Sequence, residues 1–567
     1  MSLPNYKPIW SETVILLGSG AMAELGIPTT YQMGETISKL TSTKERKSIN
    51  ERIKNLNRFN EVEEELSHFL TVLGDVFEEP DITNITDIAK KILPDNFSEN
   101  QVTLRIIQWK DNYDWNALRR LANKIPVENE DYSVYLVDLF NVIDGSLLSN
   151  QGVQVYDEAM KKHVFIYPYK LRIARNLLVL LCSLMIACAY HKTVKTNKEK
   201  FKSYLDFNEI LGKLMQDEAI DLSDIDNSNR IFYLMSYSII SFNFDPVFLW
   251  LRFFLHNEVN YYPPIIGKYS KESKIYHDFA SLIAIRDNYD RNLFETYYPI
   301  NETVARHLNK KKYTRDLLRI CKYYLVHGFT NIRECENCGK PTIVWGEWEE
   351  IPNDLFLPLP FKTDLFKNTP SSKEEEEALK EGIYDAVQCS FCGNMTYSNN
   401  NTLIMQTAYK GGHPSFIEEI QRDAKLSLSE AKHVILLGYS LPPDDVVWRS
   451  TILAKQKSKD VFCSVVVGYK GKDKWLLGEE IKEYVIHVKN EKDNKEWAAY
   501  GIQPIEAAIA IFGENNVRAY AGGIPNVWCT NNVADKYKII DLLYPENIFP
   551  DGVAKLRIQN WEKFNKN

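Results

Sequence analysis

Short, continuous runs of apolar residues recur along the chain, and most of them end at glycine, serine, asparagine or aspartate. Runs of this kind are typical of strands that are buried on both faces of a parallel sheet. Helical patterns, such as "SFIEEIQRDAKLSLSEA" at 415–431, lie between them. The sequence therefore predicts an open α/β sheet whose ligands bind at the carboxyl ends of the strands. The stretches that contain these runs are "VILLG" at 14–18, "YSIISFNFD" at 237–245, "KHVILLGYSLPPDD" at 432–445, "DVFCSVVVGYKGKD" at 460–473 and "NNVRAYAGGIPN" at 515–526.

About 200 residues separate the first of these runs from the second, and much of that interval has helical spacing. Within 60–79, for example, Val62, Leu66 and Phe69 recur at the spacing of one helix face. The apolar run "NLLVLLCSLMIACAY" at 176–190 is too short to span a bilayer and predicts a buried helix. We interpret the interval as a helical lobe packed on the sheet, without chemistry of its own.

The predicted fold class is α/β, with a Rossmann-like open parallel sheet, a zinc-ribbon module and a large helical insertion. Acidic residues dominate "SSKEEEEALKEG" at 371–382, which reads as a solvated insertion within the zinc module. The predicted parts are a discontinuous Rossmann-like domain at 1–44, 236–330 and 400–535, a helical lobe at 45–235, a zinc-binding module at 331–399 and a C-terminal segment at 536–567.

Composition narrows the class of protein. The chain has 567 residues, a net charge of −8 and no long basic tract, so direct nucleic-acid binding is not expected unless a local basic patch exists. The start, "MSLPNYKPIWSE", lacks the apolar segment of a signal peptide, so we expect a cytoplasmic protein without membrane association. In that reducing compartment, the nine cysteines are expected to be metal ligands or core residues rather than disulfides.

Two Cys-x-x-Cys-Gly motifs predict a metal site. Cys335 and Cys338 belong to "CENCGK", and Cys389 and Cys392 belong to "CSFCGN". Four thiolates give a closed tetrahedral site, so the expected ion is structural zinc. The alternative is two unrelated redox pairs, but the glycine that follows both motifs favours zinc. The other cysteines are predicted to lie in the core: Cys182, Cys188, Cys321, Cys463 and Cys529.

A glycine turn follows the first strand. Gly18-Ser19-Gly20 between a strand and a helix would direct backbone N–H groups and a helix N-terminus at a phosphate. Taken alone, the turn is equally consistent with close packing of two backbones. The role of His327 in His327-Gly328, just before the first cysteine pair, is also undecided from this motif alone, because a lone histidine is more often structural than catalytic.

Taken together and in order, these motifs resemble those of the sirtuin family of NAD-consuming enzymes. The family's Gly-Ala-Gly-x-Ser-x-x-x-Gly-Ile-Pro is similar to "GSGAMAELGIP" at 18–28, and its Thr-Gln-Asn-Ile-Asp to "SFNFD" at 241–245. Its His-Gly-Ser before the zinc cysteines is similar to "HGF" at 327–329, and its Gly-Thr-Ser-Leu to "GYSL" at 438–441. The resemblance covers residues 10 to about 530. It implies that the discontinuous domain is a sirtuin-like NAD-binding domain.

The resemblance also implies roles for individual residues. Asn243 would position a water beside the nicotinamide ribose, and His327 would be the general base towards the ribose hydroxyls. Asp245 would bind near the nicotinamide ribose or amide. Loss of nicotinamide leaves an oxocarbenium-like ribose, which requires preorganised polar groups and a base that titrates near neutral pH. The remaining NAD-binding residues are Gly18, Ser19 and Gly20 along the pyrophosphate, Gly26 and Pro28 in the loop over nicotinamide, and Gly438 and Ser440 on the adenosine side.

Three departures from the family pattern bear on activity. The family's Asp-Phe-Arg is replaced by Thr29-Thr30-Tyr31, and its first-motif serine by Met22. Its Phe-Gly-Glu, which helps to form the acyl-lysine tunnel, is missing after the cysteines, since "WGE" at 345–347 lies between the two pairs. NAD handling is therefore expected to persist without protein deacylation. This pattern is similar to divergent bacterial sirtuin-like proteins of antiphage defence.

The predicted function is an NAD glycohydrolase that releases nicotinamide and ADP-ribose, acting in antiphage defence by NAD depletion. The alternatives are an NAD-dependent protein deacylase and a catalytically silent nucleotide-binding sensor or scaffold. Retention of Asn243 and His327 argues against the silent alternative. Because unrestrained NAD cleavage would kill the host, we expect the activity to be held back by assembly, and the helical lobe is the candidate surface for forming a homo-oligomer or docking a partner. The resemblance implies that this partner is a protein such as a helicase-like ATPase or an infection sensor.

Overall fold

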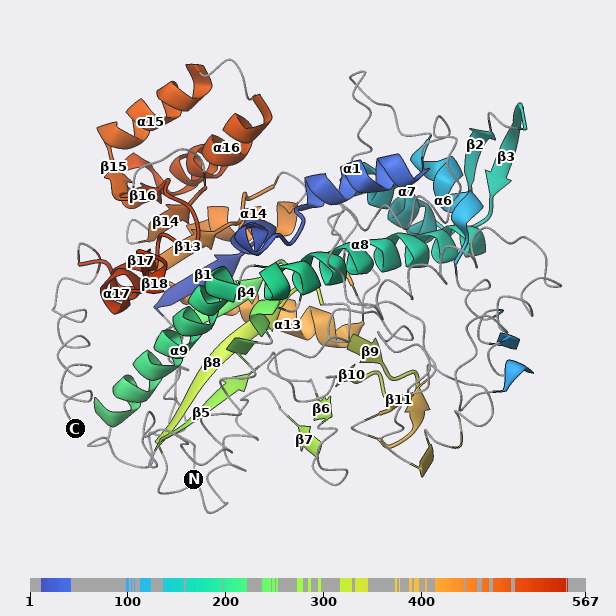
Figure 1. Ribbon diagram of the computed structural model, residues 1–567, viewed down its shortest axis with the longest axis horizontal. Coiled ribbons are helices and arrows are strands. Elements are labelled where there is room, and N and C mark those ends of the chain that lie inside the picture. Colours follow the sequence, from blue (N-terminus) through green and yellow to red (C-terminus); the bar gives the residue numbers. More distant parts are fainter. Residues whose placement is uncertain are drawn as a thin grey trace.

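A central sheet and two long helices dominate the computed structural model of the chain (Figure 1). The structure describes residues 12–41, 113–123, 136–157, 160–196, 198–221, 237–245, 247–249, 251–252, 273–278, 284–286, 294–296, 317–328, 332–344, 387–389, 392–396, 403–404, 414–442, 445–455, 461–468, 473–490 and 495–546, with isolated positions at 98–100, 103–104, 107, 373–374, 377 and 548. The predicted helix within 60–79, the "WGE" segment and most of the acidic insertion lie outside these residues.

The central sheet has eight described strands, and each neighbouring pair is parallel except for the antiparallel pair at one edge. The first strand of the chain lies in the middle, with its carboxyl end beside those of both neighbours. In spatial order the strands are β15 (Trp475–Leu477), β16 (Val517–Tyr520), β14 (Phe462–Val466), β13 (His433–Leu437), β1 (Thr13–Leu17), β4 (Tyr237–Ser241), β8 (Leu317–Leu325) and β5 (Ser273–Asp278).

The prediction of an α/β fold with a mostly parallel sheet is confirmed. All five predicted runs form strands, and they are the five adjacent strands from β4 to β16. Every residue of β1, β4, β13 and β14 is buried, which explains their continuous apolar sequences. The strand β8 was not predicted, because Arg319 and Lys322 interrupt its apolar pattern; Lys322 is buried and forms an ion pair with Asp423 of α13.

Helices cover the sheet and extend beyond it. The helices α9 and α13 pack against β8, and α16 packs against β14 and β16. The described helices are α1 (Thr30–Thr41), α6 (Trp115–Ala122), α7 (Leu136–Leu148), α8 (Pro168–Thr196), α9 (Lys198–Asp221), α13 (Ser415–Glu430), α14 (Val446–Lys455), α15 (Glu479–Asn490), α16 (Lys495–Phe512) and α17 (Lys536–Leu543), together with short 3-10 helices η1 (Ser19–Ala21), η2 (Ala23–Leu25) and η7 (Glu514–Asn516).

The helices α8 and α9 belong to the same continuous core as the sheet. The run predicted as a buried helix at 176–190 lies within α8, and Leu177, Leu180 and Leu181 are inaccessible to solvent. Among the described helices, none is both long and apolar enough to cross a bilayer. The described part of the predicted helical lobe also contains an antiparallel hairpin, β2 (Val153–Asp157) with β3 (Lys162–Ile166), which the helical interpretation missed.

Small two- and four-stranded sheets complete the described architecture. Cysteines 182, 463 and 529 are buried, as predicted, whereas the side chains of Cys188 and Cys321 lie outside the described residues. The additional strands are β6 (Ala284–Arg286), β7 (Phe294–Thr296), β9 (Ile332–Glu334), β10 (Pro341–Val344), β11 (Val387–Gln388), β12 (Met395–Thr396), β17 (Cys529–Thr530) and β18 (Val533–Ala534).

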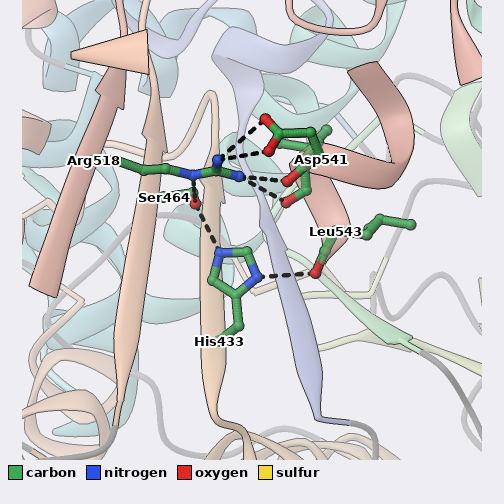
Figure 2. Close-up of polar contacts among 6 residues, drawn as sticks. His433, Ser464, Arg518, Asp541 and Leu543 are labelled. Atoms are coloured by element: carbon green, nitrogen blue, oxygen red, sulfur yellow. Dashed lines mark hydrogen bonds and ion pairs between the residues drawn. The ribbon is translucent and has the colours of Figure 1, made fainter. Parts of the chain in front are cut away.

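A buried polar network joins α17 to the sheet, at the end of β13 opposite to its carboxyl end (Figure 2). The carbonyl of Leu543 can only accept, so Nδ1–H of His433 donates to it at 3.1 Å. Nε2 of His433 then accepts from the Ser464 hydroxyl at 2.7 Å, and that oxygen accepts from Nε of Arg518 at 2.8 Å. Arg518 also binds the Asp541 carboxylate at 3.1 Å. This arrangement requires a neutral His433, because a protonated Nε2 could no longer accept from the Ser464 hydroxyl.

This network predicts a loss of stability in mild acid. Burial, reinforced by the charge of Arg518, lowers the pKa of His433 to about 3, whereas the unfolded chain titrates near the ordinary value of about 6.5. The contribution of neutral His433 to the free energy of unfolding is therefore complete above about pH 6.5 and is lost progressively as the pH falls towards 3. The free energy of unfolding should fall over this window. The variant His433→Asn should show a shallower fall, and an equal slope in both proteins would contradict this assignment.

Candidate functional site

The glycine turn after β1 packs directly against the turn after β13. Gly18 and Gly20 donate their amide hydrogens to the carbonyl oxygens of Leu437 and Gly438, each at 3.0 Å. A Cβ on Gly18 would lie 2.4 Å from the Gly438 oxygen, and Gly438 has a left-handed φ of +62°. The glycines are thus required for this backbone contact. Because two of the turn's amides are already used, any contact to a phosphate would fall chiefly to Ser19.

The helix after this turn begins with a capping box. The side-chain oxygen of Gln32 accepts from the Thr29 amide at 2.9 Å, and the Gln32 amide lies 3.4 Å from the Thr29 hydroxyl. Gly26 precedes it with a left-handed φ of 77° and ends η2. Thr29 therefore has a local structural role, since it caps α1.

A cleft opens where β1, β4 and β13 end, and it encloses about 480 Å³ including its solvent-filled mouth. Parallel sheets bind ligands at the carboxyl ends of their strands, where the chain changes direction across the sheet. The predicted site residues that line the cleft are Gly18, Ser19, Pro28, Asn243, Asp245, Gly438 and Ser440.

Asn243 stands out among the residues of the cleft. It follows β4, it is only 3% exposed, and both the nitrogen and the oxygen of its side-chain amide lack a hydrogen-bond partner among the residues that the structure describes. Leaving such groups unsatisfied costs about 1–3 kcal/mol. A buried, unsatisfied amide beside a cleft is therefore a position where a ligand or a water molecule would be bound favourably.

Asp245 is a second buried polar group in the same wall. Its carboxylate accepts from the amide of Val247 at 3.3 Å, and only 5% of the residue is exposed. Burial raises the pKa of Asp245 to about 7, partly offset by backbone hydrogen bonds. The cleft thus holds a carboxyl group that changes charge near neutral pH.

His327 lies next to the cleft wall but does not line it. The residue follows β8 and is fully buried. Its ring packs edge-on against Phe242, with ring centres 5.4 Å apart, and stacks on Phe244 at 6.2 Å. Both phenylalanines line the cleft. Of the other predicted residues, Gly20 and Gly26 are adjacent to the cleft but are not part of its lining.

Sequence reasoning missed Asp445, which is fully buried beside His327. One Asp445 oxygen lies 3.9 Å from Nε2 of His327, close enough for electrostatic interaction but too long for a hydrogen bond. The other oxygen accepts from the Tyr439 hydroxyl at 2.7 Å, and the Tyr439 ring stacks on Phe242 at 4.1 Å. The signal was present in "LPPDDVVW", where an aspartate directly precedes a helix.

The four predicted metal ligands lie together. The Sγ atoms of Cys335, Cys338, Cys389 and Cys392 all lie within 4.8 Å of one another. Cys335 and Cys392 are 3.7 Å apart, and Cys338 and Cys389 are 3.6 Å apart. In a tetrahedron with metal–sulfur bonds of about 2.3 Å the edges measure about 3.8 Å. The cysteines are thus positioned to hold one metal ion.

The two halves of this cluster have the same backbone structure. Cys335 lies in the turn of the β9–β10 hairpin and Cys389 in the turn of the β11–β12 hairpin. In each turn the cysteine carbonyl accepts from the glycine amide, at 2.8 Å from Gly339 and 2.9 Å from Gly393. Both glycines have left-handed φ angles, 66° and 74°, which explains the glycine after each motif.

The thiol chemistry also favours a cation. A backbone hydrogen bond from Asn394 lowers the pKa of Cys392 to about 6, whereas burial raises the pKa of Cys338 to about 12. Four thiolates at these separations would repel one another strongly. A divalent cation at their centre would allow all four to be ionised together.

A scan against protein-family models and a search of curated proteins both find no match to this chain.

Proposed function

We propose that the cleft binds NAD and hydrolyses the bond between nicotinamide and ribose. The carrying observation is that three motifs far apart in the sequence line one cleft, with the unsatisfied amide of Asn243 in its wall. Their sequences resemble the sirtuin motifs for this dinucleotide. Water adds to the ribose carbon as nicotinamide leaves, which gives ADP-ribose, nicotinamide and one proton.

The proposed roles follow from the position of each group. Asn243 holds the attacking water through its unsatisfied amide. Asp245, when ionised, stabilises the positive charge that develops on the ribose. His327 accepts the proton, and because Phe242 and Phe244 cover it, the substrate reaches it only after the Phe244 ring moves. Gly18, Gly20, Gly26, Pro28, Gly438 and Ser440 shape the dinucleotide site in this proposal.

The cysteine cluster is proposed to hold structural zinc in a module like a zinc ribbon. Four thiolates leave no open coordination position for a substrate. The cluster begins eight residues after His327, so its metal would fix the segment that follows β8.

The family resemblance extends this proposal to antiphage defence by NAD depletion, to homo-oligomerisation and to a partner protein.

The discriminating experiment is chromatography of the products after purified protein is incubated with NAD, with and without an acetylated peptide. We expect nicotinamide and ADP-ribose without peptide. Nicotinamide release that requires the peptide and yields deacylated product would identify a deacylase, and NAD binding without turnover would identify a scaffold.

Asp445 is proposed to position His327 rather than to touch the substrate. The variant Asp445→Asn should lower kcat with little change in KM, and by less than the roughly 10²–10⁴-fold expected for loss of the general base itself. Tyr439→Phe, which removes the hydroxyl donor to Asp445, should lower kcat less. Asp206→Asn on the surface of α9 is the control. A rise in KM with unchanged kcat would contradict the positioning role.

A further inference from the structure

An exposed aromatic surface covers one face of the β2–β3 hairpin and the start of α8. Tyr156 is 52% exposed, Phe165 50%, Tyr167 56% and Tyr169 64%. The rings contact one another along this surface: Phe165 and Tyr167 lie edge to face at 5.0 Å, and Tyr167 stacks on Tyr169 at 6.2 Å. Exposure of four large rings in one row is unusual on a protein surface and marks a binding site.

The alternation of the hairpin directs these rings outward. Tyr156 pairs across the hairpin with His163, and their rings meet at 5.3 Å. Val155 and Ile166 belong to the opposite face and are buried in the core. The hairpin lies at the edge of the molecule, beside the N-terminal end of α8 (Figure 1). We call the row formed by Tyr156, His163, Phe165, Tyr167 and Tyr169 the aromatic ladder.

The elements that carry the ladder bear more basic than acidic side chains among their described residues, in contrast to the net charge of −8 of the whole chain. Three carboxylates are paired with three of these basic groups: Asp157 with Arg120 at 2.6 Å, Asp114 with Lys170 at 2.9 Å and Asp144 with Arg175 at 2.6 Å. Glu158 lies outside the described residues. The basic residues of α6, the hairpin and the first turns of α8 are Arg119, Arg120, Lys161, Lys162, Lys170, Arg172 and Arg175.

We propose that the aromatic ladder binds single-stranded nucleic acid. Stacking rings bind bases irrespective of sequence, while neighbouring cations bind the phosphates, and this combination is typical of single-strand binding surfaces. Lys161, Lys162 and Arg172 are exposed and available for phosphates. Lysine is depleted in protein–protein interfaces, so the exposed Lys161 and Lys162 at the turn of the same hairpin favour an anionic ligand over a protein partner. This surface is the local basic patch that the whole-chain charge does not reveal.

The test is fluorescence anisotropy of labelled oligothymidylate and oligouridylate titrated with the full chain at several salt concentrations. The variant Tyr167→Ala/Tyr169→Ala should raise Kd at least about tenfold, since each stacked base contributes roughly 1–3 kcal/mol. Lys161→Gln/Lys162→Gln should reduce the slope of log K against log salt by about 0.7 for each lost phosphate contact. Tyr537→Ala is the matched control, because Tyr537 is 47% exposed and also carries a lysine, Lys536, over its ring.

The outcomes separate this proposal from its alternatives. Binding that weakens in both ladder variants and persists in Tyr537→Ala supports it. No binding at low salt, or equal loss in the control, overturns it. If the ladder variants change the oligomeric state instead of nucleic-acid affinity, the surface is a protein interface and the proposal is wrong. NAD cleavage by the ladder variants should match wild type, so the two proposed functions are tested independently.

Discussion

Alanine at His327 or at Asn243 should reduce NAD cleavage by about 10²–10⁴-fold, the usual effect of removing a general base or a comparable catalytic group. Histidine is suited to this role because it changes protonation near neutral pH. An asparagine amide is no base, so Asn243 can position water but depends on a second group to take the proton. The measurement is nicotinamide release at saturating NAD, with metal content and melting temperature determined on the same samples.

Stability should distinguish a catalytic site from a packing role. Replacing Asn243 by alanine removes two buried polar groups that have no hydrogen-bond partner in the described part of the chain, so the free energy of unfolding should stay constant or rise while activity falls. The controls are His487→Ala and Asn490→Ala, which change exposed residues of α15. Wild-type rates in both site variants would place the site elsewhere, and parallel loss of stability and activity would indicate packing.

The sequence predicted the central strands because each is buried over its whole length. In "HVILL" and "TVILL" no polar residue interrupts the apolar run, so the pattern has one interpretation. The strand β8 was not predicted because its buried lysine, Lys322, is neutralised by Asp423, a partner about 100 residues away in sequence. A non-local pair of this kind is not encoded in a window of neighbouring residues. The β2–β3 hairpin is local, and it was missed because the whole interval around it was interpreted as helical.

The candidate site was predicted in composition but not in geometry. Gly18 was expected to offer its amide to phosphate, yet its amide binds the neighbouring turn at Leu437. His327 was expected to face the substrate, yet Phe242 and Phe244 cover it. Asp445 was given no role. Each difference arises from contacts between the ends of four strands, β1, β4, β8 and β13, which the order of motifs along the chain does not specify.

The second large effect should follow loss of the proposed zinc ion. Serine at Cys335, Cys338, Cys389 or Cys392 should yield poorly soluble protein rather than a folded protein with reduced activity. Apparent binding free energies of structural zinc sites are roughly 10–16 kcal/mol, and this free energy is largely folding free energy. It exceeds or equals the whole stability of most domains, about 5–15 kcal/mol.

The measurement is elemental analysis of freshly purified protein, which should give one zinc per chain. Cys463→Ala is the matched control, since it removes a buried thiol of β14 that lies outside the cluster and should leave the zinc content unchanged. Removal of the zinc by a chelator should abolish NAD cleavage as well, because the hairpin turn that begins at Cys335 follows His327 by only eight residues. Fully active protein that contains no metal would show that the four cysteines do not need zinc, and the hairpin turns at Gly339 and Gly393 would then have to be stable without it.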